Sequence, residues 1–320
     1  MRTRFSLVAA AIALLLRADG SRPVAERPTH PAGSSVSRVT GFSGRPFGVH
    51  VTRSGGVIVT AQDVDRIMHL DSSMTPTAYL GVGSDPGDVV ANWRGTTAYV
   101  SGFHDGTIAV VDLVADSVVS LMKLPSRNAY RLALSPNEKR LFVTTTEGIL
   151  YALGPDERRV HSTKRLEGSL QGIALDHPGR NVFVSSSAGD IWRLDRVSLR
   201  TIGTTHLHCR AQDVVLDRDD VELYVACEEG SVVILDPRTL EIVANLAVPT
   251  GSAFGLAVTP DNAQLYVTSP ASGDISIFDR ASRENVSNLP VKGVPRRVAF
   301  NARGDKAFVT NEWNWLNVIN

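Results

Sequence analysis

The amino-acid sequence predicts an all-β fold, a seven-bladed β-propeller built from four-stranded antiparallel blades. The main observation is a repeat in which an isoleucine or an aromatic residue is followed by valine. The repeat occurs seven times, and its valines are 41, 43, 41, 41, 42 and 42 residues apart. A period near forty residues with several short strands in each copy is typical of propeller blades. The seven pairs are Ile58-Val59, Tyr99-Val100, Phe142-Val143, Phe183-Val184, Tyr224-Val225, Tyr266-Val267 and Phe308-Val309.

The turns between the strands favour the same fold class. In the sixth copy an apolar strand over residues 256–258 leads into the turn Thr259-Pro260-Asp261-Asn262, and further strands follow over residues 264–268 and 274–278. Proline presets one backbone dihedral of such a turn, and asparagine tolerates the positive φ that a tight turn needs. Each copy is therefore expected to supply consecutive antiparallel strands joined by short turns.

A second repeated position precedes the third strand of each copy. Two copies place Asp65 and Asn314 there, and the other five place glycine. Aspartate and asparagine are the residues that best replace glycine in left-handed backbone, so positive φ is expected at this position in every blade. The glycines are Gly106, Gly148, Gly189, Gly230 and Gly273.

The last copy lacks a fourth strand, because the chain ends at Asn320 where the other six copies continue. The segment Val36-Ser37-Arg38-Val39-Thr40 has the length and alternation of a strand and precedes the first blade. We expect it to pair with the last blade and close the ring, which removes an exposed sheet edge. The propeller is thus expected to span residues 36–320.

The N-terminal residues have the pattern of an export signal. Arg2 and Arg4 precede an apolar run from Phe5 to Leu16, and Ala18-Asp19-Gly20 then supplies small residues at a cleavage site. This pattern predicts a signal peptide over residues 1–20 and a secreted or periplasmic location. The run is too short to span a bilayer, which takes about 20 apolar residues, so no transmembrane segment is expected.

The segment that follows, residues 21–35, is rich in proline, glycine and serine and is expected to be a flexible linker. Over the whole chain, 33 lysines and arginines balance 33 aspartates and glutamates. Because no net field attracts a polyanion, no nucleic-acid partner is expected.

Two blocks of the sixth copy resemble those of the YVTN-repeat (YncE-like) propellers. They are Leu265-Tyr266-Val267-Thr268 and Gly273-Asp274-Ile275-Ser276-Ile277-Phe278-Asp279. The likeness covers residues 36–320. It implies the seven-bladed fold. It implies no single activity, because that group includes surface-layer, binding and exported proteins as well as relatives of propeller lactonases.

Antiparallel order places two sets of loops on one face of a propeller, the loops before the first strands and those between the second and third strands. This face is expected to carry the ligand-binding rim around the channel mouth. The candidates are Glu147, Gln171, Gln212, Glu228, Arg296 and Asn311. Their mixed chemistry favours a non-catalytic, monomeric binding or scaffold protein for a protein, glycan or small-molecule partner, with no cofactor expected.

The rival interpretation is a metal-dependent enzyme of the lactonase or lyase type with its site at the channel mouth. Glu147, Glu228 and Asn311 would then surround a divalent metal ion. Only fold analogy supports this interpretation. The chain contains no Gly-x-Ser-x-Gly, His-Glu-x-x-His or Cys-x-x-Cys-His motif, and no catalytic residue is assigned.

The fifth copy departs most from the repeat. Its first loop contains His206, His208 and Cys209, and it is expected to face Cys227 across the rim. Cys209 and Cys227 are the chain's two cysteines. Three states stay open: a disulfide between them, two buried thiols, or a metal site that also uses both histidines. For the disulfide, the strand partner of Cys227 is expected to be Ala211 or Gln212, so the loop must fold inward to bring Cys209 close.

Two further features are minor. The acidic turn from Asp217 to Glu222 resembles a calcium ligand set but lacks the glycine of a hand-type loop, so an ordinary turn is expected. Asn285-Val286-Ser287 matches the rule for N-glycosylation, which matters only in a eukaryotic secretory route.

Overall fold

The computed structural model describes residues 34–320. The predicted signal peptide, residues 1–20, and residues 21–33 of the predicted linker lie outside the described residues.

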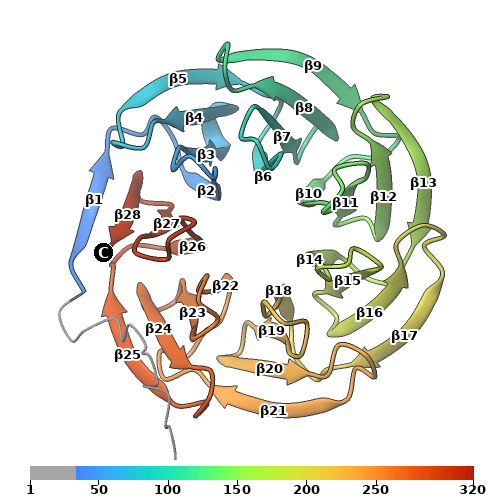
Figure 1. The fold of residues 1–320 in the computed structure, drawn as a ribbon, viewed down its shortest axis with the longest axis vertical. Coiled ribbons are helices and arrows are strands. Elements are labelled where there is room, and N and C mark those ends of the chain that lie inside the picture. The colour runs from blue at the N-terminus through green and yellow to red at the C-terminus, as the bar shows by residue number, and fades with distance from the viewer. Residues whose placement is uncertain (1–33) are drawn as a thin grey trace, which may run out of the picture. The chain divides into compact units, whose positions relative to one another are not determined.

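The described chain forms seven four-stranded antiparallel sheets, which are arranged in a ring (Figure 1). Blades 1 to 6 consist of β2–β5, β6–β9, β10–β13, β14–β17, β18–β21 and β22–β25, and blade 7 consists of β26, β27, β28 and β1. The first half of the strands are β1 (Val36–Thr40), β2 (Pro46–Val51), β3 (Val57–Ala61), β4 (Arg66–Leu70), β5 (Pro76–Gly81), β6 (Pro86–Ala91), β7 (Thr97–Gly102), β8 (Thr107–Asp112), β9 (Ser117–Lys123), β10 (Ala129–Leu134), β11 (Leu141–Thr145), β12 (Ile149–Gly154), β13 (Arg159–Arg165) and β14 (Leu170–Leu175). The second half are β15 (Asn181–Ser186), β16 (Asp190–Asp195), β17 (Thr201–His206), β18 (Ala211–Leu216), β19 (Leu223–Cys227), β20 (Ser231–Leu235), β21 (Ile242–Ala247), β22 (Leu256–Val258), β23 (Gln264–Ser269), β24 (Asp274–Asp279), β25 (Asn285–Pro290), β26 (Pro295–Phe300), β27 (Ala307–Asn311) and β28 (Trp315–Ile319).

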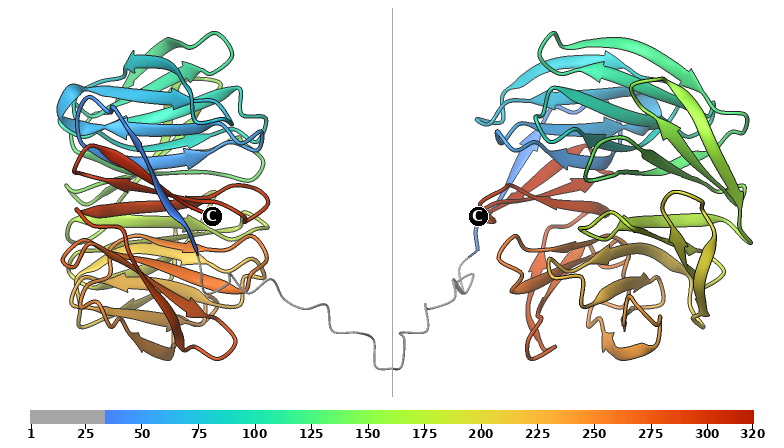
Figure 2. Two further views of the ribbon diagram at one scale, coloured as in Figure 1. Left: turned by 90° about the vertical axis from the view of Figure 1, so that its left-hand side faces the viewer. Right: turned by 45° about the vertical axis from the view of Figure 1, so that its right-hand side comes forward.

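The ring closes as the sequence predicts. Strand β1 pairs antiparallel with β28, from Val36 opposite Ile319 to Thr40 opposite Trp315. Figure 2 shows β1, in blue, lying beside the red strands of blade 7. The first and last segments of the described chain therefore share one sheet, and blade 7 has four strands like the others.

The hydrophobic core lies between the blades. The aromatic residue or isoleucine before each repeated valine packs against the neighbouring blade, so that Tyr224 of blade 5 shares a buried cluster with Leu256 and Val267 of blade 6. Neighbouring side chains on a strand point to opposite faces, so a central strand such as β19 contributes to the clusters on both sides of its blade. This alternation explains why the repeat shows an aromatic residue and a valine side by side.

The expected left-handed position is present in all seven blades. Asp65 and Asn314 have φ of 57° and 66°, and the five glycines at this position have φ between 67° and 95°. At Gly189 a side chain is also excluded sterically, because a Cβ atom would lie 1.9 Å from the carbonyl oxygen of Leu207.

Six of the seven innermost strands, all except β22, carry a bulge, and in five of the six a hydroxyl group from the second strand binds the bulged backbone. In blade 2 the pairing register shifts between Pro86 and Val89. The hydroxyl of Ser101 accepts a hydrogen bond from the Asp88 N–H at 2.9 Å and donates one to the Tyr130 carbonyl of blade 3 at 2.9 Å. Blade 5 has Ala226 at this position and lacks the hydroxyl. The equivalents in the other blades are Thr60, Thr144, Ser185, Thr268 and Thr310.

Helix is scarce in the part of the chain that the structure describes. The 3-10 turn Gln62–Val64 is its one helical segment. No helix in that part is long and apolar enough to cross a membrane.

Candidate functional site

The two faces of the ring differ in their connections. We call the face with the loops before the innermost strands and between the second and third strands the loop face, and the opposite one the turn face. Each bulge lies near the loop-face end of its strand and directs one residue toward the channel. The residue at this position, which we call the bulge residue, is in chain order Gly48, Asp88, Arg131, Gly172, Asp213, Gly255 and Arg297. Gly255 lies directly before β22, whose pairing has no register shift. Four of the seven are charged, two of each sign.

The four charged bulge residues contact one another across the channel. The Arg131 guanidinium lies 2.9 Å from an Asp88 carboxylate oxygen and 3.1 Å from one of Asp213. Arg297 lies 2.9 Å from the second Asp213 oxygen. These residues belong to blades 2, 3, 5 and 7, so the contacts connect blades that are not all neighbours (Figure 1). We call these four residues the channel network.

The channel network is buried and electrically neutral. Only 3% of the Asp88 surface and 2% of the Asp213 surface is exposed. Burial raises the pKa of Asp88, and the opposing attraction of Arg131 lowers it only in part. Burial also lowers the pKa of Arg131, but Asp213 and Asp88 outweigh this and raise it above its ordinary value. Mutual pairing therefore supports charges that would be costly to bury alone.

Aromatic rings and a third arginine, Arg296, lie next to this network on the loop face. They come from the position one residue before each bulge. The rings of Phe47 and Tyr130 are 6.1 Å apart, and so are those of Phe47 and Phe254. The guanidinium of Arg296 lies 4.6 Å from the centre of the Phe254 ring, and that of Arg297 lies 4.7 Å from it. Phe47 and Phe254 are buried, with 6% and 7% of their surfaces exposed. Tyr130 and Arg296 are half-buried, so they form the accessible part of this group.

Three of the predicted rim residues occupy the same position as these rings. They are Gln171, Gln212 and Arg296. The Gln212 amide donates to Glu228 at 3.0 Å, and Glu228 also pairs with Arg210 at 3.1 Å. Arg296 pairs with Glu312 at 2.6 Å. The structure thus brings Gln171, Gln212, Glu228 and Arg296 to the mouth.

The other two predicted rim residues lie elsewhere. Glu147 is exposed on the loop between β11 and β12, where Asn128 donates to it at 3.4 Å. Asn311 differs from the expectation, because it is fully buried. Its amide donates to the Lys292 carbonyl at 2.6 Å and accepts from the Val294 N–H at 2.9 Å. This side chain therefore binds backbone groups of the loop before β26.

Glu147, Glu228 and Asn311 accordingly do not converge. They come from blades 3, 5 and 7, and each has different partners. Within residues 34–320 no group of three histidine, cysteine, aspartate or glutamate side chains is placed to hold a metal ion.

The loop of blade 5 folds inward and joins the two cysteines. Ala211 pairs with Cys227 in the strand register, and Cys209 reaches Cys227 with a Cα–Cα distance of 5.5 Å in a disulfide. His206 pairs with Asp190 at 2.9 Å, and its ring meets that of His208 edge to face. Both sulfur atoms are used in the disulfide, so the structure does not assemble these residues as the ligands of a metal site.

Reduction of this disulfide is expected to destabilise the protein by about 3 kcal/mol, because it releases a closed loop from the constraint. Denaturant unfolding with and without a reductant measures the difference. The double variant Cys209→Ser/Cys227→Ser is the control, since a reductant should leave its stability unchanged. Two titratable thiols in the unreduced, folded protein would contradict the pairing.

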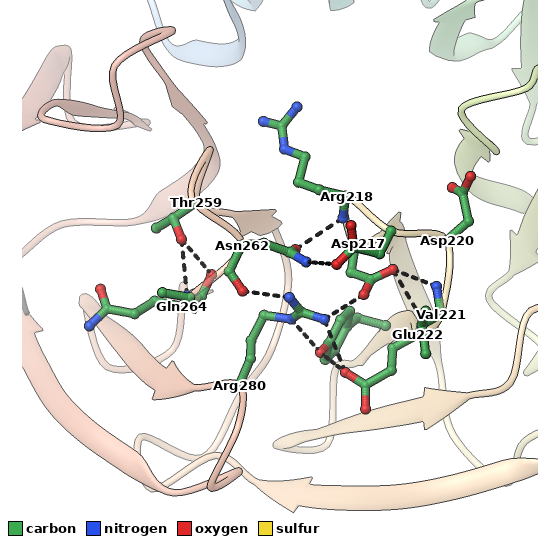
Figure 3. A network of polar contacts seen from close by, with 12 residues as sticks. Asp217, Arg218, Asp220, Val221, Glu222, Thr259, Asn262, Gln264 and Arg280 are labelled. Carbon is green, nitrogen blue, oxygen red and sulfur yellow. Dashed lines mark hydrogen bonds and ion pairs between the residues drawn. The ribbon is translucent and has the colours of Figure 1, made fainter. Parts of the chain in front are cut away.

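The acidic turn of blade 5 is an ordinary turn bound by arginine (Figure 3). The Asp217 carboxylate accepts from Arg280 of blade 6 at 2.6 Å and from the Val221 N–H at 2.7 Å. Glu222 pairs with Arg280 at 3.2 Å and with Arg283 at 2.8 Å. These carboxylates tie blade 5 to blade 6 and are already neutralised.

Sequence reasoning did not include Arg131, Asp213 and Arg297 among the rim candidates. A signal for them is present, because each stands one residue before the apolar residue that faces the repeated valine. In every copy this position is either glycine or charged.

Comparison with known proteins gives a fold likeness. No family model matches the chain, and no curated protein matches its sequence. Among solved structures, hydrazine synthase of Kuenenia stuttgartiensis is similar, with a TM-score of 0.80, 15% sequence identity and coverage of 89% of this chain and 97% of that one. At this identity the likeness establishes the seven-bladed β-propeller fold and assigns the chain to no family.

Proposed function

We propose that the chain is an exported, non-catalytic binding or scaffold protein whose partner, a protein, glycan or small molecule, docks on the loop face around the channel mouth. The half-buried side chains of Tyr130 and Arg296, which pack on the buried rings of Phe47 and Phe254, carry this proposal. Aromatic and arginine side chains are the groups that most often supply binding energy at interfaces. The neutral channel network beneath them provides a rigid base.

An exposed tryptophan extends this surface. Trp313 lies on the loop between β27 and β28, and 60% of its surface is exposed. The preceding residue, Glu312, pairs with Arg296 of the mouth. Trp313 also meets the Trp315 ring edge to face at 5.8 Å. A tryptophan side chain has only two rotatable bonds, so it loses little entropy when a partner covers it.

We also propose that the chain is a monomeric relative of the YVTN-repeat propellers that is exported by its N-terminal signal. The repeated aromatic-valine pairs and the left-handed position before each third strand support the first part. The basic and apolar start of the sequence supports the second.

The test compares matched tryptophan variants on a glycan array and on an array of purified extracellular proteins. Trp313→Ala on the loop face is expected to weaken a specific interaction at least tenfold, about 1.4 kcal/mol. Trp93→Ala is the control, because Trp93 is 61% exposed and lies in the turn between β6 and β7 on the turn face. Loss of binding in Trp93→Ala alone, or no ligand on either array, would refute the proposal.

A separate measurement distinguishes this proposal from the metal-dependent lactonase or lyase. Elemental analysis of the purified protein is expected to find no stoichiometric divalent ion. One tightly bound ion per chain, lost together with an activity in Glu228→Gln, would favour the enzyme.

A further inference from the structure

The channel contains a second feature at its opposite end. A cavity of about 330 Å³ opens on the turn face. The last residues of β14, β18, β22 and β26 form its wall, so four neighbouring blades contribute to it. Asp213 of the channel network precedes Val215 of the wall by two residues in β18, which places the cavity on the far side of the network from the channel mouth.

Small side chains at one position of the repeat line part of the cavity. Ala174, Val215 and Ala257 stand at equivalent places in their blades and line the cavity. Leu175 and Phe300 add further apolar side chains to its wall. A volume near 300 Å³ is at the lower end of the range for small-molecule sites.

His177 and Arg218 stand at the edge of this cavity, and they differ in their partners. His177 is held by Asp220, with its Nδ1 2.9 Å from the carboxylate. Arg218 is fixed through its backbone N–H, which donates to Asn262 at 3.0 Å. Figure 3 shows its side chain directed away from the Asp217–Arg280 contacts. No hydrogen bond or ion pair from residues 34–320 reaches its guanidinium.

We propose that this cavity binds a small amphipathic carboxylate, with the apolar chain in the cavity and the carboxylate on Arg218. A guanidinium forms paired, charge-assisted hydrogen bonds with a carboxylate, and its fork fixes the orientation of the ligand. The apolar wall supplies the hydrophobic part of the affinity. The site lies on the turn face and is independent of the proposed function of the loop face.

The full chain is titrated with octanoate and with the uncharged 1-octanol, by calorimetry and by methyl NMR. Octanoate is expected to bind more tightly than octanol and to shift the methyl signals of Val215 and Leu256. The methyl signals of Val119 and Val286, exposed on outer strands β9 and β25, should stay in place.

Variants separate the two parts of the site. Arg218→Gln is expected to weaken octanoate binding about tenfold and to leave octanol binding unchanged. Arg303→Gln is the matched control, since Arg303 is also exposed on the turn face but lines a different cavity beside β2 and β26. Ala257→Leu should reduce the binding of both ligands by filling the cavity, with a melting curve to verify folding.

Three results would overturn the proposal. One is the absence of octanoate binding at millimolar concentration. Another is an equal loss of octanoate and octanol binding in Arg218→Gln. The third is ligand-induced shifts outside the cavity methyl groups.

Discussion

A chain that starts at Phe42 is expected to melt about 10 °C or more below one that starts at Gly33, since the lost stability amounts to several kcal/mol. The shorter chain lacks β1, whose five residues pair with β28. Each lost hydrogen bond removes about 0.5–1.5 kcal/mol. The deletion also removes Val39 from the cluster that contains Val57 and Leu316. Because total stabilities are about 5–15 kcal/mol, this is a large share.

Circular dichroism during heating measures both melting temperatures, and light scattering detects association through the exposed edge of β28. Removal of residues 1–32 alone leaves every described strand in place, so the longer chain is the control. Equal melting temperatures for the two chains would show that β1 does not close the ring.

Replacing Arg131 by methionine is expected to cost about 3–5 kcal/mol of unfolding free energy, because it leaves a buried carboxylate without its cation. Asp88 loses its ion pair, and Asp213 keeps only Arg297. In this variant the folded-state pKa of Asp88 rises further above its unfolded value. When the pKa of a carboxyl group is higher in the folded than in the unfolded state, the protein loses stability as the pH rises between these two values. The loss of unfolding free energy in Arg131→Met should therefore be larger at pH 8 than at pH 5.

Urea unfolding at the two pH values measures this effect. Arg127→Met is the matched control, since Arg127 is exposed in the loop before the same strand, and its change should stay within about 0.5 kcal/mol. Adding Asp88→Asn to Arg131→Met should recover part of the loss and remove most of the pH dependence. A small, pH-independent effect of Arg131→Met would show that the channel network does not stabilise the ring of blades.

Much of the fold follows from local patterns. The spacing of the seven valines predicts the number of blades, and alternation within Val36–Thr40 predicts the closing strand. Asp65 and Asn314 are identified as left-handed positions by their alignment with glycines, and their φ values agree. These features depend on neighbours in one strand or turn, and a repeat displays each of them several times.

Local sequence patterns predict only part of the candidate site. Gln171, Gln212 and Arg296 were placed on the rim because loop order is a property of the topology. Asn311 is expected on the rim but is buried in the structure, and its burial depends on how the loop at Lys292 folds over it. The state of Cys209 stayed open since the path of its loop cannot be read from strand register.

The sequence by itself determined the blade count, the strand order, the turn conformations and the way the ring closes. The tertiary structure alone decided which charges meet. Arg131 pairs with residues 43 positions before it and 82 positions after it, and Arg280 reaches back 63 positions to Asp217. A repeat fixes the position of each residue within its own blade. The partner across the channel depends on the bulges and on closure of the whole ring, which bring distant copies of the same position to one axis.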